Sequence, residues 1–288
     1  MTTLDEVCRR ARALPCSPAL LPRLIALLER HDTEIGELAQ LIQVDPALAA
    51  ATVRMANSAY FGAASPAATV SEAVLRLGVR ELYRLAALSL TARWMEIEVD
   101  GYRWEAGDFC RASLINAVAA DTLARRTGAV EPDLAYTCGL VHEIGKLAVA
   151  FSCGASFPAI RTRRIALGGT WLEAETDVLG FNHAGVGARL LAEWRFPEAC
   201  VVVAERNPPD GSIPAVHRAL AAHVHAARHL AASFGAGQGE DAFLYTLDSA
   251  LLDEHGLGPA VLEAALPAIL ERASRLLHEK LSTGRIVF

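Results

Sequence analysis

Apolar residues recur at helical spacing along nearly the whole of this 288-residue chain. The stretches 20–28 and 35–42 are typical, because their leucines and isoleucines lie three or four residues apart, as on one face of a helix. No segment shows a convincing alternation of apolar and polar residues, which a half-buried strand requires. The pattern therefore predicts an all-α fold without a substantial β-sheet.

Capping residues, prolines and glycines divide this pattern into separate helices. Ser, Thr, Asp and Asn side chains accept hydrogen bonds from the first backbone N–H groups of a helix, and proline fits its first turn. The expected starts are Asp45-Pro46, Thr69–Glu72, Pro132, Thr170–Glu173, Asn182 and Pro197. Glycine favours the left-handed conformation that ends a helix. The expected ends are Gly78 and Gly128.

Two segments mark the boundaries of the expected domains. Val99–Gly107 is irregular in composition, and Gly235–Gly239 is a glycine-rich link. We expect an N-terminal bundle over residues 1–100, a second bundle over 101–234 and a C-terminal extension over 235–288, with helices near 242–255 and 259–281. Gly235–Gly239 lacks a preceding strand and matches no nucleotide-binding spacing, so it does not indicate a phosphate loop.

The charge and the cysteines indicate the protein's surroundings. The net charge of −6 is spread along the chain and gives no reason to expect nucleic acid or an anionic membrane as a partner. No uninterrupted apolar run is long enough to span a bilayer. The six cysteines are scattered without a CxxC pair, and no signal peptide is recognisable. We therefore expect reduced thiols in a cytoplasmic protein.

The stretch Gly139–Ala150, GLVHEIGKLAVA, places His142 and Glu143 inside an apolar run. Buried ionisable side chains are costly unless they are paired, neutralised or bound to a metal. The stretch therefore predicts either a metal site or the remains of one. Gly145 is expected to break the helix just after the His–Glu pair.

Several motifs together resemble the HDOD domain, a regulatory relative of the HD-domain phosphohydrolases. They are Asp45–Leu48, Met55–Gly62, Val70–Val74 with Leu77-Gly78, Gly139–Lys146, and His183–Gly187 with Trp194 and Pro197. The resemblance covers about residues 14–232. It implies an N-terminal helical bundle packed on a degenerate HD-like bundle, and a role in bacterial signal transduction.

A working HD enzyme uses a His … His-Asp … Asp set to hold divalent metals that activate water. On the resemblance, the first His falls at Ala112 and the last Asp at Arg228, while the central pair is His142-Glu143. Alanine cannot ligate, arginine repels a metal, and glutamate displaces its oxygens by one C–C bond. A zincin motif also fails, because Lys146 stands where HExxH needs histidine. We therefore expect no catalytic residue, no metal and no cofactor.

The favoured interpretation of His142 and Glu143 is a hydrogen-bonded polar cluster with Lys146 or Arg228 as its counter-charge. An adventitious metal or a small ligand in the vestigial cavity is the alternative, with His142, Glu143 and His183 as weak candidates. His183 is more simply a packing or capping residue at a helix start.

Two other groups of polar side chains have ordinary explanations. The three histidines at 223, 225 and 229 crowd one helix and are expected to be solvated or hydrogen-bonded, beside or opposite its buried face. The arginines at 161, 163 and 164 are expected to form a solvated helix end, with an anion contact as the alternative. Cys138 and Cys153 flank the central stretch and are most simply small core side chains.

Asn57 and Ser58 interrupt an apolar helix. A helix stop is the favoured interpretation. The alternative is that they line a cleft or a partner surface. Lys146 and Arg228 are further candidates for such a surface.

The leading hypothesis is a non-catalytic regulatory protein that presents helical surfaces to unidentified signalling proteins, with a small ligand in the vestigial cleft as a modulator. Self-association through exposed helical faces is also compatible with the sequence. The alternatives are a divergent metal-dependent phosphohydrolase or phosphodiesterase using His142, Glu143 and His183, and a nucleotide-responsive binding module using Arg161–Arg164.

Overall fold

A computed structural model describes residues 2–11, 23–24, 26–27, 30, 34–43, 46–58, 61, 66–94, 101–105, 107–236, 240 and 246–282. These residues form helices joined by turns, with no strand among them, so the predicted all-α fold is confirmed. The predicted helix over 20–28 lies partly outside these residues. The predicted cap at Asp45 lies outside them altogether.

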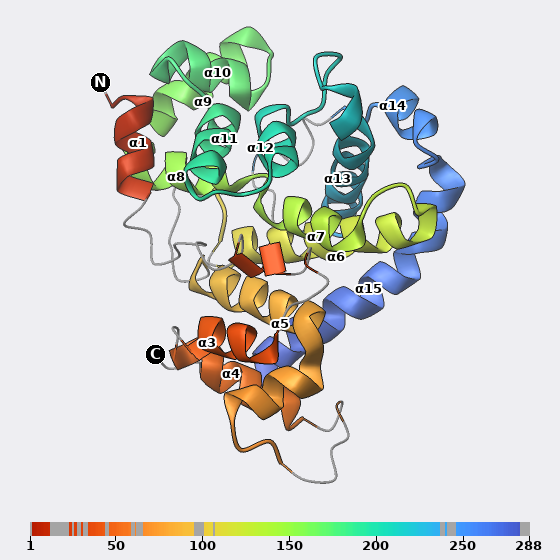
Figure 1. Cartoon of the computed structure of the whole chain (residues 1–288). Helices are drawn as coiled ribbons and strands as arrows, with labels where there is room; N and C mark the ends of the chain where they lie inside the picture. The colour runs from red at the N-terminus through yellow and green to blue at the C-terminus, as the bar shows by residue number, and fades with distance from the viewer. Residues whose placement is uncertain are drawn as a thin grey trace. The chain divides into compact units, whose positions relative to one another are not determined.

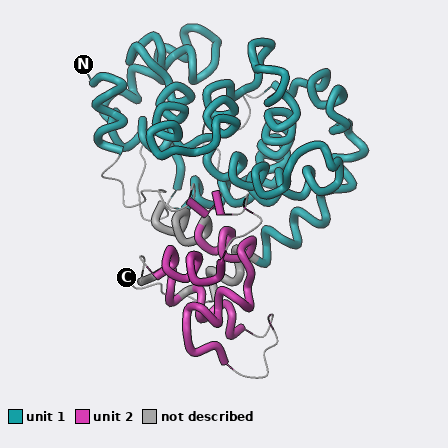
Figure 2. The backbone as a smooth tube through the Cα atoms, viewed as in Figure 1, with its two compact units in different colours: residues 1–16, 93–285 teal, residues 17–92, 286–288 magenta. Residues whose placement is uncertain are grey.

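The chain divides into two compact units (Figure 2). Unit 1 comprises Met1–Cys16 and Arg93–Arg285, and unit 2 comprises Ser17–Ala92 and Ile286–Phe288. The first and last helical segments of unit 1 therefore pack against helices of the predicted second bundle. Whether the segments 1–100, 101–234 and 235–288 fold independently, as the predicted domain division implies, stays a prediction.

Unit 2 contains α3 (Ile35–Gln43), α4 (Pro46–Ala56) and α5 (Val70–Trp94) as far as Ala92. The apolar stripe of α3 is buried against α4, as its spacing predicts. One half of the predicted capping box is formed at the start of α5, where Thr69 Oγ1 accepts from the Glu72 N–H at 3.1 Å. The Glu72 carboxylate accepts from Ala68 rather than from Thr69. Gly78, with φ of 74°, is the expected left-handed residue and kinks α5.

Unit 1 is built around α6, a helix whose side chains are buried on nearly every side. It packs against α7, α13 and α15 (Figure 1). The helices of the unit, with one 3-10 turn, are α1 (Leu4–Ala11), α6 (Asp108–Thr127), α7 (Pro132–Val141), α8 (Ile144–Cys153), η2 (Gly154–Ser156), α9 (Phe157–Leu167), α10 (Trp171–Leu179), α11 (His183–Glu193), α12 (Glu198–Glu205), α13 (Ala215–Ser233), α14 (Ser249–Glu254) and α15 (Pro259–Ser282).

The predicted helix ends in unit 1 are confirmed where one side chain or one glycine determines them. Gly128 ends α6 with φ of 66°, and Pro132 starts α7. Thr170 and Glu173 form the capping box of α10. The Asn182 side chain accepts from the Gly185 N–H at the start of α11.

A buried carboxylate attaches the C-terminal helix α15 to α6. Asp121 is fully buried and accepts hydrogen bonds from Arg125 on its own helix. Arg272 of α15 forms an ion pair with the other Asp121 oxygen at 2.5 Å and donates to Thr122. This pairing is one of the contacts that join the C-terminal helix to α6, together with buried apolar residues of α15 such as Ala273.

One stretch of unit 1, Pro132–Leu167, is long and apolar enough to cross a bilayer by length and composition. It runs through α7, α8 and α9, and 89% of its most apolar window is buried inside the protein. Its apolar side chains therefore serve the protein's own core.

The central stretch is interrupted as predicted, but the break lies at His142 and Glu143 themselves and not at Gly145. Gly145 is inside α8, where that helix crosses α11 at very short range. A Cβ atom on Gly145 would lie 1.9 Å from the His183 carbonyl oxygen and 2.6 Å from the Gly187 nitrogen. The glycine is therefore explained by close backbone approach, which local sequence does not reveal.

Replacing Gly145 with alanine is expected to lower the free energy of unfolding by about 2–3 kcal/mol, because α8 and α11 must separate to admit the methyl group. Gly154→Ala is the matched control, since a Cβ there meets nothing within 4 Å. Urea unfolding of the two variants measures the difference. Equal stability of both would contradict a tight crossing of α8 and α11.

Candidate functional site

The turn between α7 and α8 carries His142 and Glu143 into the interior of unit 1. His142 follows the last residue of α7, and Glu143 immediately precedes α8. Both side chains are buried, with exposed fractions of 3% and 6%. Their hydrogen bonds and charges therefore have to be satisfied inside the protein.

Glu143 is the centre of a buried ion-pair cluster. Its Oε1 atom lies 2.8 Å from Lys146 Nζ and 2.9 Å from Arg228 Nη2, and both cations are buried. Lys146 is on α8 and Arg228 on α13, so the cluster links two helices. The predicted pairing of Glu143 is confirmed, with both candidate cations contributing.

The charges around Glu143 determine its ionisation. Burial alone would raise the pKa of the Glu143 carboxyl, but the Arg228 and Lys146 cations hold that pKa well below its ordinary value. The carboxylate therefore stays ionised at neutral pH. Arg228 also donates to the side-chain oxygen of Asn207, at 3.4 Å.

His142 is neutral in this setting. Burial lowers its pKa to about 4, and the Arg228 and Lys146 cations act in the same direction, while Glu143 opposes them. The Nδ1 atom lies 2.9 Å from the Gly139 carbonyl oxygen, so Nδ1 carries the proton and donates it. The Nε2 atom is buried and has no hydrogen-bond partner among the described residues.

A second buried network holds His183. Glu175 accepts the Tyr102 hydroxyl at 2.5 Å on one oxygen, and the His183 backbone N–H and Nδ1 at 2.8 Å on the other. Burial acts to raise the pKa of Glu175, but the contacts with His183 and Tyr102 outweigh it and lower that pKa. Lys146 Nζ lies 5.8 Å from the centre of the Tyr102 ring, which connects the two networks.

The structure therefore brings four of the predicted residues together and holds the fifth beside them. His142, Glu143, Lys146 and Arg228 form one cluster, whereas His183 is bonded to a carboxylate that the sequence interpretation missed. Glu175 could have been found, because it lies one turn after the buried Trp171 on α10. Tyr102 lies in the irregular segment between the predicted bundles, where no periodicity indicates burial.

The residues present do not fit the divalent metals of HD enzymes. Ala112 is buried and ends in a methyl group. The Glu143 oxygen Oε1 already contacts two cations, and these would repel a metal ion. His142 Nε2 could ligate, but one imidazole nitrogen does not make a site. Within the described ranges no group of three or more His, Cys, Asp or Glu side chains could hold a metal ion.

Two of the three predicted histidines of α13, His223 and His225, are hydrogen-bonded as predicted, but they are more deeply buried than expected. His223 Nε2 lies 2.8 Å from Thr127 Oγ1, and His225 Nε2 accepts from the Asp248 N–H at 3.1 Å. Burial lowers the pKa of His225 to about 4, with Arg228 adding to the shift. The cause is that α13 is contacted by α6, α7, α12, α14 and α15, so several of its faces are covered.

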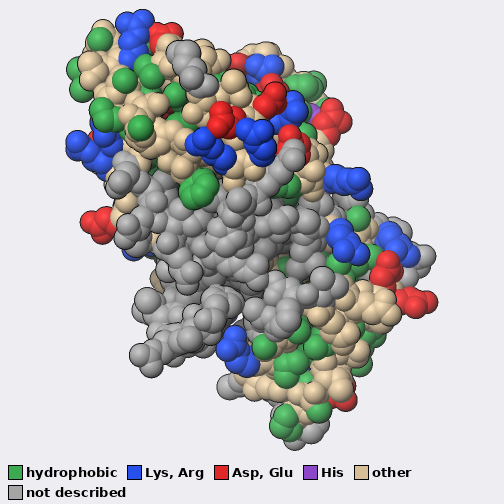
Figure 3. Space-filling model, turned by 90° about the vertical axis from the view of Figure 1, so that its left-hand side faces the viewer, with side chains coloured by type: hydrophobic (Ala, Val, Ile, Leu, Met, Phe, Trp, Pro, Cys, Tyr) green, Lys and Arg blue, Asp and Glu red, His purple; other side chains and the backbone are tan. Residues whose placement is uncertain are grey.

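The arginines of α9 are engaged within the protein. Arg161 donates to Glu240 and to the Gly101 carbonyl, and Arg163 pairs with Asp177 at 2.7 Å. The Arg164 guanidinium lies over the Trp171 ring. Acidic and basic side chains are interspersed on the face in Figure 3. These contacts favour the solvated, paired interpretation over an anion site.

In unit 2, α4 ends at Ala56, which confirms the predicted helix stop, and the residue that follows is Asn57. Its side chain donates to the Ala67 carbonyl at 3.0 Å and accepts from the Ala67 N–H at 2.7 Å. Arg76 also donates to the Asn57 side-chain oxygen. Ser58 is exposed and donates to Met55 in its own turn. Whether either residue contacts a partner stays a prediction.

Asn57→Ala is expected to lower the free energy of unfolding by about 1–2 kcal/mol, because both backbone groups of the buried Ala67 lose this partner. Ser58→Ala serves as the control, with a change within about 0.5 kcal/mol for an exposed hydroxyl. Thermal unfolding of the two variants measures both values. Indistinguishable variants would count against the structural role of Asn57.

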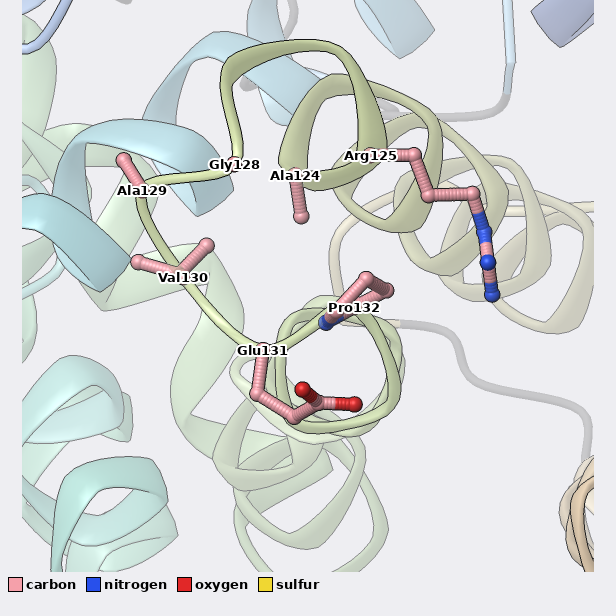
Figure 4. A pocket seen from close by; sticks show the side chains of 7 residues that line it. All are labelled: Ala124, Arg125, Gly128, Ala129, Val130, Glu131 and Pro132. Atoms are coloured by element: carbon pink, nitrogen blue, oxygen red, sulfur yellow. The ribbon is translucent and has the colours of Figure 1, made fainter.

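An open hollow of about 570 Å³ lies at the other end of α7, at the turn that follows α6 (Figure 4). Its lining is Ala124, Arg125, Gly128, Ala129, Val130, Glu131 and Pro132. Arg125 forms an ion pair with Asp121, and its side chain points away from Gly128 in Figure 4. The hollow therefore lacks the convergent polar groups of a ligand site.

Comparison with known proteins shows which protein family the sequence matches. The family model of the HDOD domain matches residues 14–208. The chain is 27% identical over 207 residues to an uncharacterized protein of Treponema pallidum (strain Nichols), and this covers 68% of the chain but only 38% of the relative's length.

Two solved structures have a similar fold. An HDOD domain protein of unknown function from Geobacter sulfurreducens is 25% identical, with a TM-score of 0.66 and coverage of 96% of this chain and 95% of the other. A candidate signal transduction protein from Marinobacter aquaeolei VT8 is 25% identical, with a TM-score of 0.69 and coverage of 96% and 60%.

Proposed function

The chain belongs to the HDOD domain family, and on that premise we propose that it is a non-catalytic regulatory protein that acts by binding signalling proteins. Similarity to the Marinobacter candidate signal transduction protein supports a regulatory role. The proposed partners are unidentified signalling proteins, and self-association is proposed as a further way in which the chain acts.

The observation that carries the proposal is the pairing of Glu143 with two buried cations. In an HD enzyme the carboxylate of this doublet binds metal, and the metal activates water. Here Lys146 and Arg228 supply the positive charge from the chain itself. These ion pairs tie Glu143 to one cation on α8 and one on α13, and they occupy the carboxylate oxygen Oε1 with charges of the protein itself.

The alternative of a divergent phosphohydrolase is tested with the purified full-length protein, manganese or ferrous iron, and a phosphodiester substrate. We expect turnover no higher than the buffer rate, and the same result for His142→Ala. Metal-dependent turnover that His142→Ala abolishes would overturn the proposal.

The regulatory role is tested by affinity capture from the source cell with the wild type and His142→Ala as matched baits. A partner retained by both baits, and bound again when each component is pure, supports a surface-based role. Failure of every captured candidate to bind in purified form would count against it.

A further inference from the structure

Two cysteines that are far apart in sequence meet in the core of unit 1. Cys138 is in the last turn of α7 and Cys200 near the start of α12. Their sulfur atoms lie 2.8 Å apart, and both residues are essentially unexposed. The sequence interpretation treated Cys138 as a small core side chain, and nothing in the spacing of 62 residues indicates this contact.

The two thiols are positioned to react with each other. They project from helices that pack together, and a disulfide requires the two sulfur atoms to approach each other by only about 0.8 Å more. Each sulfur is the other's hydrogen-bonding neighbour. An oxidised sulfur formed at either position would therefore find its partner at once.

We propose that Cys138 and Cys200 are an oxidation site at which a peroxide converts the two thiols into an intrachain disulfide. One thiolate attacks a peroxide oxygen, the O–O bond breaks, and a sulfenic acid and one water result. The second sulfur then attacks the sulfenic sulfur, the S–O bond breaks, and a second water leaves with both protons accounted for. The two sulfurs lose two electrons, which the peroxide gains.

The surroundings determine the rate of this reaction. Burial raises the pKa of Cys138 well above its ordinary value, and the neighbouring Cys200 adds to the effect. The thiolate is the reactive form, so oxidation at neutral pH is slow and accelerates as the pH rises. The site is thus suited to a slow, lasting modification and not to rapid sensing.

A disulfide here would join α7 to α12, and both helices lead to residues in or beside the buried cluster. The Cys138 carbonyl accepts the His142 N–H at 2.9 Å, so the bond would be anchored one turn before the His–Glu pair. Cys200 lies on the helix that precedes Asn207, the side chain that Arg228 contacts. A disulfide between residues 62 positions apart closes a long loop and so restricts the unfolded chain. We therefore expect the melting temperature to rise by roughly 5–15 °C.

The test treats reduced full-length protein with hydrogen peroxide at neutral and mildly alkaline pH, followed by denaturation, alkylation of the remaining thiols and peptide mapping. We expect a linked Cys138–Cys200 peptide, faster formation at the higher pH and a raised melting temperature. Cys200→Ala should abolish the link and the rise. Cys153→Ala, which removes another buried cysteine of the same unit, should leave both unchanged.

The proposal is overturned if Cys138 and Cys200 are both alkylated after an exposure that has fully oxidised other cysteines. It is also overturned if Cys200→Ala shows the same rise in melting temperature as the wild type. The outcome is independent of the regulatory function, because it depends only on the contact between α7 and α12.

Discussion

Replacing Glu143 with alanine is expected to lower the free energy of unfolding by about 3–5 kcal/mol, because Lys146 and Arg228 would remain buried without the carboxylate that both contact. Urea unfolding followed by circular dichroism measures this loss.

Arg228→Met is the informative companion variant. It leaves one carboxylate and one cation, so the remaining pair stays neutral, and we expect a smaller loss than for Glu143→Ala. In the double variant, the methionine removes one of the two cations that Glu143→Ala leaves behind. Its loss should therefore be less than the sum of the single losses by more than about 1 kcal/mol. Additive losses would contradict a coupled cluster.

The second large effect is a loss of stability in mild acid. Burial lowers the pKa of His142 and of His225 to about 4, against an ordinary value of 6.5. The unfolded chain therefore takes up protons first as the pH falls. The stability that depends on these neutral imidazoles is fully present above about pH 6.5 and is lost between there and about pH 4. Each histidine accounts for roughly 2 kcal/mol of that loss by pH 5.

The neighbours of the two histidines explain why this loss is expected. Arg228 lowers the pKa of both, while Glu143 beside His142 and Asp248 beside His225 only partly oppose burial. The depressed pKa values of Glu143 and Glu175 add a further loss below about pH 4.5.

Denaturant unfolding at a series of pH values measures this loss. His142→Gln should reduce the dependence on pH between 6.5 and 4 by roughly a third to a half, because His225 and His223, whose pKa values burial also lowers, still titrate. A free energy of unfolding that stays constant, or rises, as the pH falls from 7 to 5 would contradict the burial of neutral histidines.

Helix ends could be predicted from sequence where the determinant is local. Gly128 ends α6 because its backbone needs a left-handed residue, and Asn182 starts α11 through its own side chain. Gly145 was misinterpreted for the opposite reason. Its role comes from the backbone of α11, some forty residues further along the chain, and a glycine that permits close approach looks in sequence like one that ends a helix.

The candidate site was likewise only partly predictable. His142 and Glu143 could be found because two ionisable residues interrupt an apolar run, and Arg228 because the family resemblance placed it opposite them. Tyr102 and Glu175 are 73 residues apart, and only the folded chain brings them together. The same holds for Cys138 and Cys200, whose contact depends on how α7 packs against α12.

The measurement that tests the central claim most directly is the metal content and metal affinity of the purified protein. If Lys146 and Arg228 supply the charge that Glu143 needs, the wild type should bind manganese, iron or zinc only weakly and below one ion per chain, and His142→Ala should behave in the same way. One tightly bound ion per chain that His142→Ala removes would contradict the claim that the chain's own cations have replaced the metal.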